Sequence, residues 1–167
     1  GLIADISERP VEGAEIDGHG RFLLPGFVDM HGDMIEKCVE PRVNVRMPLE
    51  LGVYDLDKML AANGVTTAYA AVAFTPATYG HVRSIEHTHA MIEKLASMRD
   101  ELLIDHRVHG RFEVTFLPAI EEAKVLINAG ALHLISLMDH TPGQGQYRDI
   151  ELHIANTAKV KKISETQ

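Results

Sequence analysis

The stretch that decides the fold is PGFVDMHGD at residues 25–33. It is a short apolar run with polar residues at its end, the pattern of a buried parallel strand that ends at a site. Because side chains alternate across a strand, His31 and Asp33 are predicted on the same side, and Gly32 between them leaves room for a ligand. Imidazole and carboxylate together suit a divalent metal, zinc or manganese, that activates a water. A His-x-Asp spacing is weak by itself, so the rest of the chain must support it.

Strands and helices alternate after this stretch. Asp55 is placed to cap a short helix and Gly64 to end it. Apolar runs and helical spacings then predict strands at 65–74, 102–114 and 132–138, with helices at 82–100 and 117–129 between them. This order predicts an α/β fold with a parallel sheet, either an open doubly wound sheet or about four βα units of a partial TIM-like (β/α) barrel.

The segments on either side of residues 25–149 differ from this pattern. Two alternating apolar patches, 2–6 and 21–24, are separated by turn-rich sequence and predict short antiparallel strands. We interpret residues 1–24 as the remnant of a small β domain. Residues 150–167 are polar and are predicted to form a helical or frayed tail.

The predicted strand around residues 105–113 has one wholly polar face. Such residues are costly to bury unless they pair with one another, bind a metal or hold an anion. The alternative is an exposed face on an edge strand, where charge discourages aggregation. Inside a barrel, Glu113 would lie nearest the carboxyl end and meet His31 and Asp33, while the two arginines would grip phosphate oxygens. The residues of this face are Arg107, His109, Arg111 and Glu113.

The last predicted strand runs into SLMDHTPGQGQ at residues 136–146. Asp139 and His140 again fall at a carboxyl end, where ligand sites of parallel α/β folds lie, and a loop rich in glycine and amides follows. The alternative is an ordinary turn in which Asp139 caps backbone amides. Histidine paired with carboxylate at three strand ends favours one shared site.

The composition excludes several classes of function. The 167 residues are 46% apolar, which is enough for a globular core. A net charge of −8 disfavours a nucleic-acid or acidic-membrane surface, and the apolar run 68–74 is far shorter than the roughly 20 residues of a membrane span. Cys38 is the single cysteine, so no internal disulfide forms and the cytoplasm is the expected compartment. Ten histidines in this length indicate metal or proton chemistry.

The motifs, taken in order, resemble a known family. LPGFVDMH at 24–31 resembles the opening of the amidohydrolase superfamily, in which a small β domain leads into the first strand of a metal-bearing barrel. HGD at 31–33, EK at 36–37, PR at 41–42, DHRVH at 105–109 and SLMDHTPGQ at 136–144 are similar to its phosphonate-metabolism branch. The last motif is specific, whereas the first is shared across the superfamily.

The resemblance implies a metal-dependent hydrolase that releases diphosphate from the triphosphate of a ribose methylphosphonate. It implies His31 and Asp33 as metal ligands, with Asp33 replacing a histidine usual in the superfamily, and Glu113 as a further ligand. Asp139 and His109 are the candidate acceptors of the water proton. We expect the substrate, a small phosphorylated sugar, to contact Lys37, Arg107, Arg111 and His140.

Two other functions stay open. One is hydrolysis of an amide or cyclic amide by the same metal-bound water. The other is a binding module or fragment without a complete site, because a full barrel takes about 250 residues and eight strands and only four strands are predicted here. Ligands from later strands have no counterpart after His153. An open half barrel would expose sheet edges, so we expect a homo-oligomer.

Overall fold

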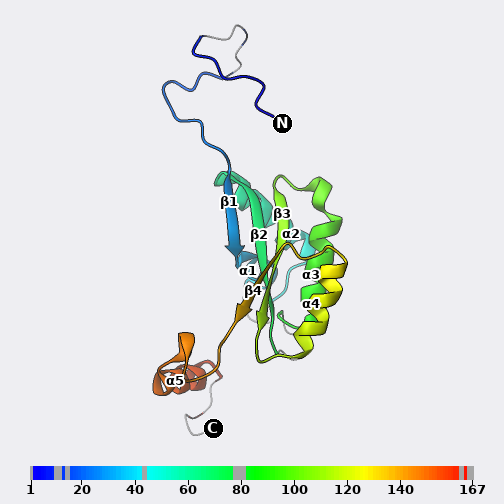
Figure 1. The fold of residues 1–167 in the computed structure, drawn as a ribbon, viewed down its shortest axis with the longest axis vertical. Helices are drawn as coiled ribbons and strands as arrows, with labels where there is room; N and C mark the ends of the chain where they lie inside the picture. The colour runs from blue at the N-terminus through cyan, green and yellow to red at the C-terminus, as the bar shows by residue number, and fades with distance from the viewer. Residues whose placement is uncertain are drawn as a thin grey trace.

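The computed structural model describes residues 2–9, 13, 16–42, 45–76, 82–161 and 164, apart from the side chains of residues 146, 160 and 161. Its centre is one parallel four-stranded sheet in the order β1-β2-β3-β4 (Figure 1). The strands are β1 (Phe27–Gly32), β2 (Val65–Phe74), β3 (Asp105–Glu113) and β4 (Leu134–Met138). The helices are α1 (Met34–Val39), α2 (Leu49–Ala62), α3 (Ile85–Ser97), α4 (Pro118–Asn128) and α5 (Ile150–Lys161).

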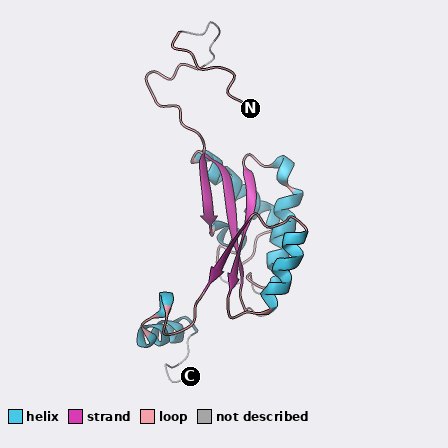
Figure 2. Cartoon of the chain, viewed as in Figure 1, coloured by secondary structure: helices cyan, strands magenta, loops and turns pink. Residues whose placement is uncertain are grey.

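Each strand pairs only with its neighbours in sequence, and helices α2, α3 and α4 lie on one side of the curled sheet (Figure 2). A doubly wound sheet would carry helices on both faces. The α/β class, the parallel sheet and the four strands are therefore confirmed, and the arrangement is compatible with the first half of a (β/α) barrel. β3 lies between β2 and β4, so the alternative of an exposed polar face on an edge strand does not hold.

The core lies between the sheet and these helices. The rings of Phe74 on β2 and Phe112 on β3 stack with centroids 4.5 Å apart. Val108 continues the apolar face of β3, and Met91 and Leu95 of α3 pack in the same buried cluster. This is the face opposite the polar residues of β3, as the alternation of the strand predicts.

A buried carboxylate–imidazole pair joins α2 to the start of β3. Asp57 and His106 are each 2% exposed in their side chains, with Oδ1 of Asp57 3.1 Å from Nε2 of His106. The same carboxylate accepts hydrogen bonds from the backbone N–H groups of Leu103 and Ile104. Asp57 was not singled out from the sequence, because a carboxylate on the helical face of α2 has no local pattern that marks it as buried, and His106 was noted only as part of the DHRVH motif.

The two strands predicted near the N-terminus are wrong. Residues 2–6 and 21–24 form no strand, and Leu2, Phe22 and Leu23 are more than nine-tenths exposed. A two-stranded hairpin is marginal in water without a layer to pack on, and among the described residues nothing covers this segment. The assignment of residues 1–24 to a separate β domain stays a prediction.

Two helix predictions also need correction. Asp55 does not cap its helix, because α2 begins at Leu49 after Pro48 and Asp55 lies exposed within it. Gly64, with φ +79°, does end the helix as predicted. On α4 the buried residues are Ala119 and Leu126. The sequence of 117–129 predicts the apolar set Ile120, Ala123, Val125 and Ile127. Of these, Ala123 packs against the core, whereas the other three are at least half exposed.

The exposed apolar face of α4 has a simple cause. α4 packs on β3, and α5 lies at the far end of the molecule instead of beside it (Figure 1). Residues 150–161 form helix α5, and residues 162–163 and 165–167 lie outside the described part of the chain. Within that described part, no helix has the length and apolar character needed to cross a bilayer.

Candidate functional site

Side chains of β1 and β3 meet across β2 at the carboxyl ends of the strands. The inward positions of β2 here are Ala71 and Ala73, which pair with His109 and Arg111 of β3. The methyl groups of these two alanines leave space above β2, and the longer side chains of β1 and β3 meet in that space. The His31 and His109 rings meet edge to face with centroids 4.9 Å apart, although their strands are not neighbours.

Asp33 is the second link between β1 and β3. Nη1 of Arg111 donates a hydrogen bond of 2.6 Å to Oδ1 of Asp33. The same oxygen lies 3.6 Å from Nε2 of His31, so His31 and Asp33 share one side as predicted. Asp29 helps to set this geometry, because its Oδ1 accepts a hydrogen bond from the N–H of His31 at an irregularity in the β1 register.

His109 is held in one tautomer. Its Nδ1 lies 3.2 Å from the carbonyl oxygen of Met30, which can only accept, so Nδ1 carries the proton. Nε2 then accepts from the hydroxyl of Ser136 at 2.8 Å. Burial lowers the pKa of His109, and the nearby charges of His31 and Arg111 lower it further, so the ring is neutral at pH 7. A neutral ring is the form that binds a metal or accepts a proton.

Glu113 and His140 form a separate pair. Glu113 is 7% exposed at the end of β3, and its carboxylate accepts from the backbone N–H of His140 at 3.1 Å and from Nδ1 of His140 at 2.5 Å. Asp139 accepts from the N–H of Thr141 and the amide of Gln144. Hydrogen bonding by the Thr141 side chain, then by the Thr141 backbone and by Gln144, lowers the pKa of Asp139. Asp139 therefore serves the turn that was the alternative prediction.

Arg107 and Lys37 lie outside these two groups. Arg107 is at the start of β3, where Nε donates to Oδ2 of Asp105 at 2.8 Å and Nη1 is 3.4 Å from the hydroxyl of Tyr69. Lys37 lies on α1 and lines the wall of a cavity next to Asp33. The structure thus gathers His31, Asp33, His109 and Arg111 without Arg107.

The donor atoms partly fit a divalent metal. Two ligand atoms about 2.0–2.1 Å from a tetrahedral ion lie about 3.3–3.4 Å apart, close to the separation of His31 and Asp33. Within the described ranges, however, no three His, Cys, Asp or Glu side chains are grouped as a metal requires. Glu113 bonds His140 and is not joined to His31 or Asp33 by any hydrogen bond or ion pair.

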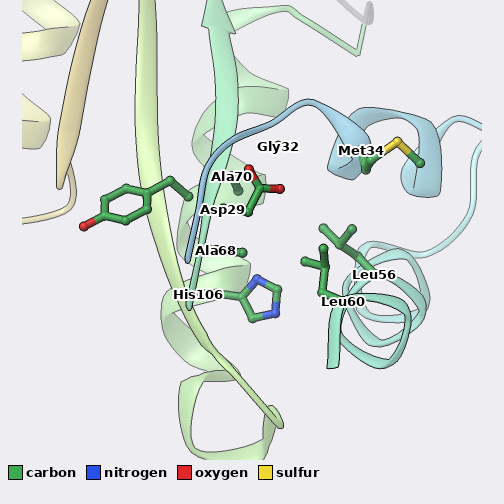
Figure 3. A pocket seen from close by; sticks show the side chains of 9 residues that line it. Asp29, Gly32, Met34, Leu56, Leu60, Ala68, Ala70 and His106 are labelled. Atoms are coloured by element: carbon green, nitrogen blue, oxygen red, sulfur yellow. The ribbon is translucent and has the colours of Figure 1, made fainter. Parts of the chain in front are cut away.

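Two cavities lie away from this site. Figure 3 shows a small one on the helix side of the sheet, lined by Asp29, Leu56, Leu60 and His106. Its volume of about 10 Å³ holds about one water molecule, so it takes no substrate. A second, of about 220 Å³, is lined by Leu95, Gly130 and His133 near the amino ends of the strands, opposite the candidate residues.

Sequence reasoning missed the residues that shape the site. Ser136 donates to His109 and Asp29 accepts from the N–H of His31, and neither residue was predicted to act there. One sequence feature could have indicated the site. Ala71 and Ala73, at alternate positions of β2, give one face of that strand small side chains, which leaves space for longer side chains from the neighbouring strands. Ser136 also shares a strand face with a residue two positions away, Met138, but no sequence pattern marks Ser136 as a partner of His109.

One comparison with known proteins is informative. The chain is 35% identical over 141 residues to the alpha-D-ribose 1-methylphosphonate 5-triphosphate diphosphatase of Escherichia coli strain K12. The match covers 81% of this chain and 36% of that protein, so the chain spans about a third of the length of its relative. No family profile matches the chain. No solved structure matches it.

Proposed function

We propose that this chain is part of a metal-dependent hydrolase of the amidohydrolase superfamily, and that the hydrolase releases diphosphate from a ribose 1-methylphosphonate 5-triphosphate. The identity to a protein named as that diphosphatase carries the proposal. The cluster of His31, Asp33, His109 and Arg111 at the carboxyl end of a parallel sheet supports it, because enzymes with parallel α/β barrels place their sites there.

His31 and Asp33 are the residues that would hold the metal, with His109 beside them. Glu113 is proposed as a further ligand, which requires its carboxylate to leave His140. When bound, a zinc or manganese ion lowers the pKa of a water and neutralises charge on a phosphoryl group. Arg111 orients the Asp33 carboxylate by donating to Oδ1.

The remaining residues bind substrate and move a proton. Of the two predicted proton acceptors, His109 is the better placed, because it is neutral and its Nε2 accepts from a hydroxyl in the structure. Asp139 is occupied by its own turn. Arg111 and Lys37 would bind phosphate oxygens, and His140, carried on the loop after β4, would close over the sugar.

Metal binding by the purified chain tests this proposal. The chain is dialysed against zinc or manganese, and bound metal is counted by elemental analysis for the wild type, Asp33→Ala and the control Asp55→Ala, which changes an exposed carboxylate of α2. We expect metal in the wild type and the control and at least a tenfold weaker affinity in Asp33→Ala. Release of diphosphate from a ribose triphosphate is then followed. Metal binding that is insensitive to Asp33, or hydrolysis of an amide without release of diphosphate, refutes the proposal.

A further inference from the structure

A large cavity adjoins the candidate site. It lies between α1, the segment Pro41–Arg42 and the turn at Val82–Arg83 that precedes α3, and it has a volume of about 600 Å³. Ligand sites of small molecules have volumes of about 300–1,000 Å³. Asp33 lines the cavity and also bonds Arg111, so the cavity shares a wall with the candidate metal site.

The lining of this cavity carries three carboxylates and three cations, and two of the carboxylates are paired with arginines from outside the lining, Arg111 and Arg46. Each of its three carboxylates already pairs with an arginine, which leaves no negative charge on the wall uncompensated. Two further cations line the same cavity, Lys37 and Arg42, and no described residue forms an ion pair or hydrogen bond with either side chain. The three pairs are Asp33–Arg111 at 2.6 Å, Glu36–Arg83 at 2.8 Å and Glu40–Arg46 at 3.1 Å.

The position of these two cations is informative because the chain as a whole has a net charge of −8. Lys37 and Arg42 are exposed side chains without a described partner, and such a local group of basic residues attracts anions. Arg83 forms a fixed part of the same wall, since both Nε and Nη2 lie 2.8 Å from Oε2 of Glu36, whose side chain is 9% exposed. Glu36 thus holds this guanidinium at one place on the wall.

We propose that this cavity binds the terminal diphosphate group of the ligand, with Lys37 and Arg42 donating to its oxygens and Arg83 forming the wall beside them. The inference rests on the proposed function for the reaction but assigns a new site, because Arg42 and Arg83 have no role in it so far. A diphosphate held here would place the bond to the next phosphorus beside Asp33 and Arg111. That placement explains why the proposed reaction would release two phosphates together.

Binding of inorganic diphosphate to the purified chain tests the inference. Calorimetric titrations at low ionic strength compare the wild type, Lys37→Ala, Arg42→Ala and the control Lys58→Ala, which removes an exposed lysine of α2 outside the cavity. Charge-assisted hydrogen bonds of this kind predict a loss of affinity of about tenfold for each of the first two variants and no change for the control. Inorganic monophosphate, which spans fewer donors, should bind at least tenfold more weakly than diphosphate.

The outcomes separate this site from the proposed function. Because Lys37 and Arg42 are exposed, the variants should keep the circular dichroism spectrum and melting temperature of the wild type. Diphosphate binding that depends on both residues supports the inference even in a chain that binds no metal and hydrolyses nothing. No measurable binding, or binding that Lys58→Ala weakens as much as Arg42→Ala, overturns it even if Asp33-dependent diphosphate release is observed.

Discussion

Replacement of Asp57 by alanine should destabilise the fold strongly. The carboxylate serves three groups at once: the N–H of Leu103, the N–H of Ile104 and the ring of His106. Leu103 is 69% exposed, so water can replace its bond, whereas Ile104 and the His106 ring are buried. Each buried group left without a partner costs about 1–3 kcal/mol, so the two together predict a loss of about 3 kcal/mol in the free energy of unfolding.

The measurement is urea unfolding followed by circular dichroism. Asp57→Asn keeps one carbonyl acceptor and should lose less than the alanine variant. Asp55→Ala on the same helix is the matched control, because that side chain is exposed, and it should lie within about 0.5 kcal/mol of the wild type. If Asp57→Ala matched Asp55→Ala, the buried pair would not stabilise the fold and the reasoning would be refuted.

Three further changes test the packing and the pH response. Gly52→Ala would place a Cβ 2.8 Å from the side chain of Val39. We expect the midpoint of urea unfolding to fall by an amount equivalent to about 1–3 kcal/mol. An unchanged midpoint would show that α1 and α2 can move apart without cost. Phe112→Ala removes the ring stacked on Phe74 and should lower the free energy of unfolding by about 3–5 kcal/mol in the same urea experiment. A loss of less than about 1 kcal/mol would show that the stacked rings are not part of the core. Burial is the main cause that lowers the pKa of His133 in the folded chain, and the positive charges of nearby arginines lower it further. On acidification, His133 is therefore protonated at a higher pH in the unfolded chain than in the folded chain. Stability should therefore fall as the pH drops below about 6.5, the ordinary pKa of the unfolded ring, and His133→Asn, which keeps an acceptor without a charge, should fall less; an equal fall in both would exclude His133 as a source.

The main features of the sheet could be predicted because they depend on local patterns. VTTAYAAVAF at 65–74 is mostly apolar, apart from two threonines near its start, and it forms β2 with those bounds. Alternation along 105–113 separated Val108 and Phe112 from the polar face, and the structure buries both against the helices. The prediction of N-terminal strands was wrong because alternation shows only that a strand can form. Whether the strand is stable depends on a packing layer, and local sequence does not show whether that layer is present.

The candidate site was predictable by residue type and only partly by contact. His31 and Asp33 lie together because both stand at the carboxyl end of one strand, which is a local relation. Arg111 bonds Asp33 and Glu113 bonds His140, and these choices depend on the curl of the sheet and the path of the loop after β4. Asp57 and His106 were missed for the same reason, since their pairing joins segments that no short motif connects.

The strand order has a consequence for synthesis of the chain. Every strand hydrogen-bonds with the one made just before it, so β1 and β2 can join while the later strands are still inside the ribosome. Each newly emerged strand and helix then adds to an existing edge, and no earlier pairing has to open to admit it. The sheet can therefore assemble from the N-terminus onward during synthesis. Only hydrogen bonding between the first and the last strand of a closed barrel would have to wait until the whole polypeptide is made.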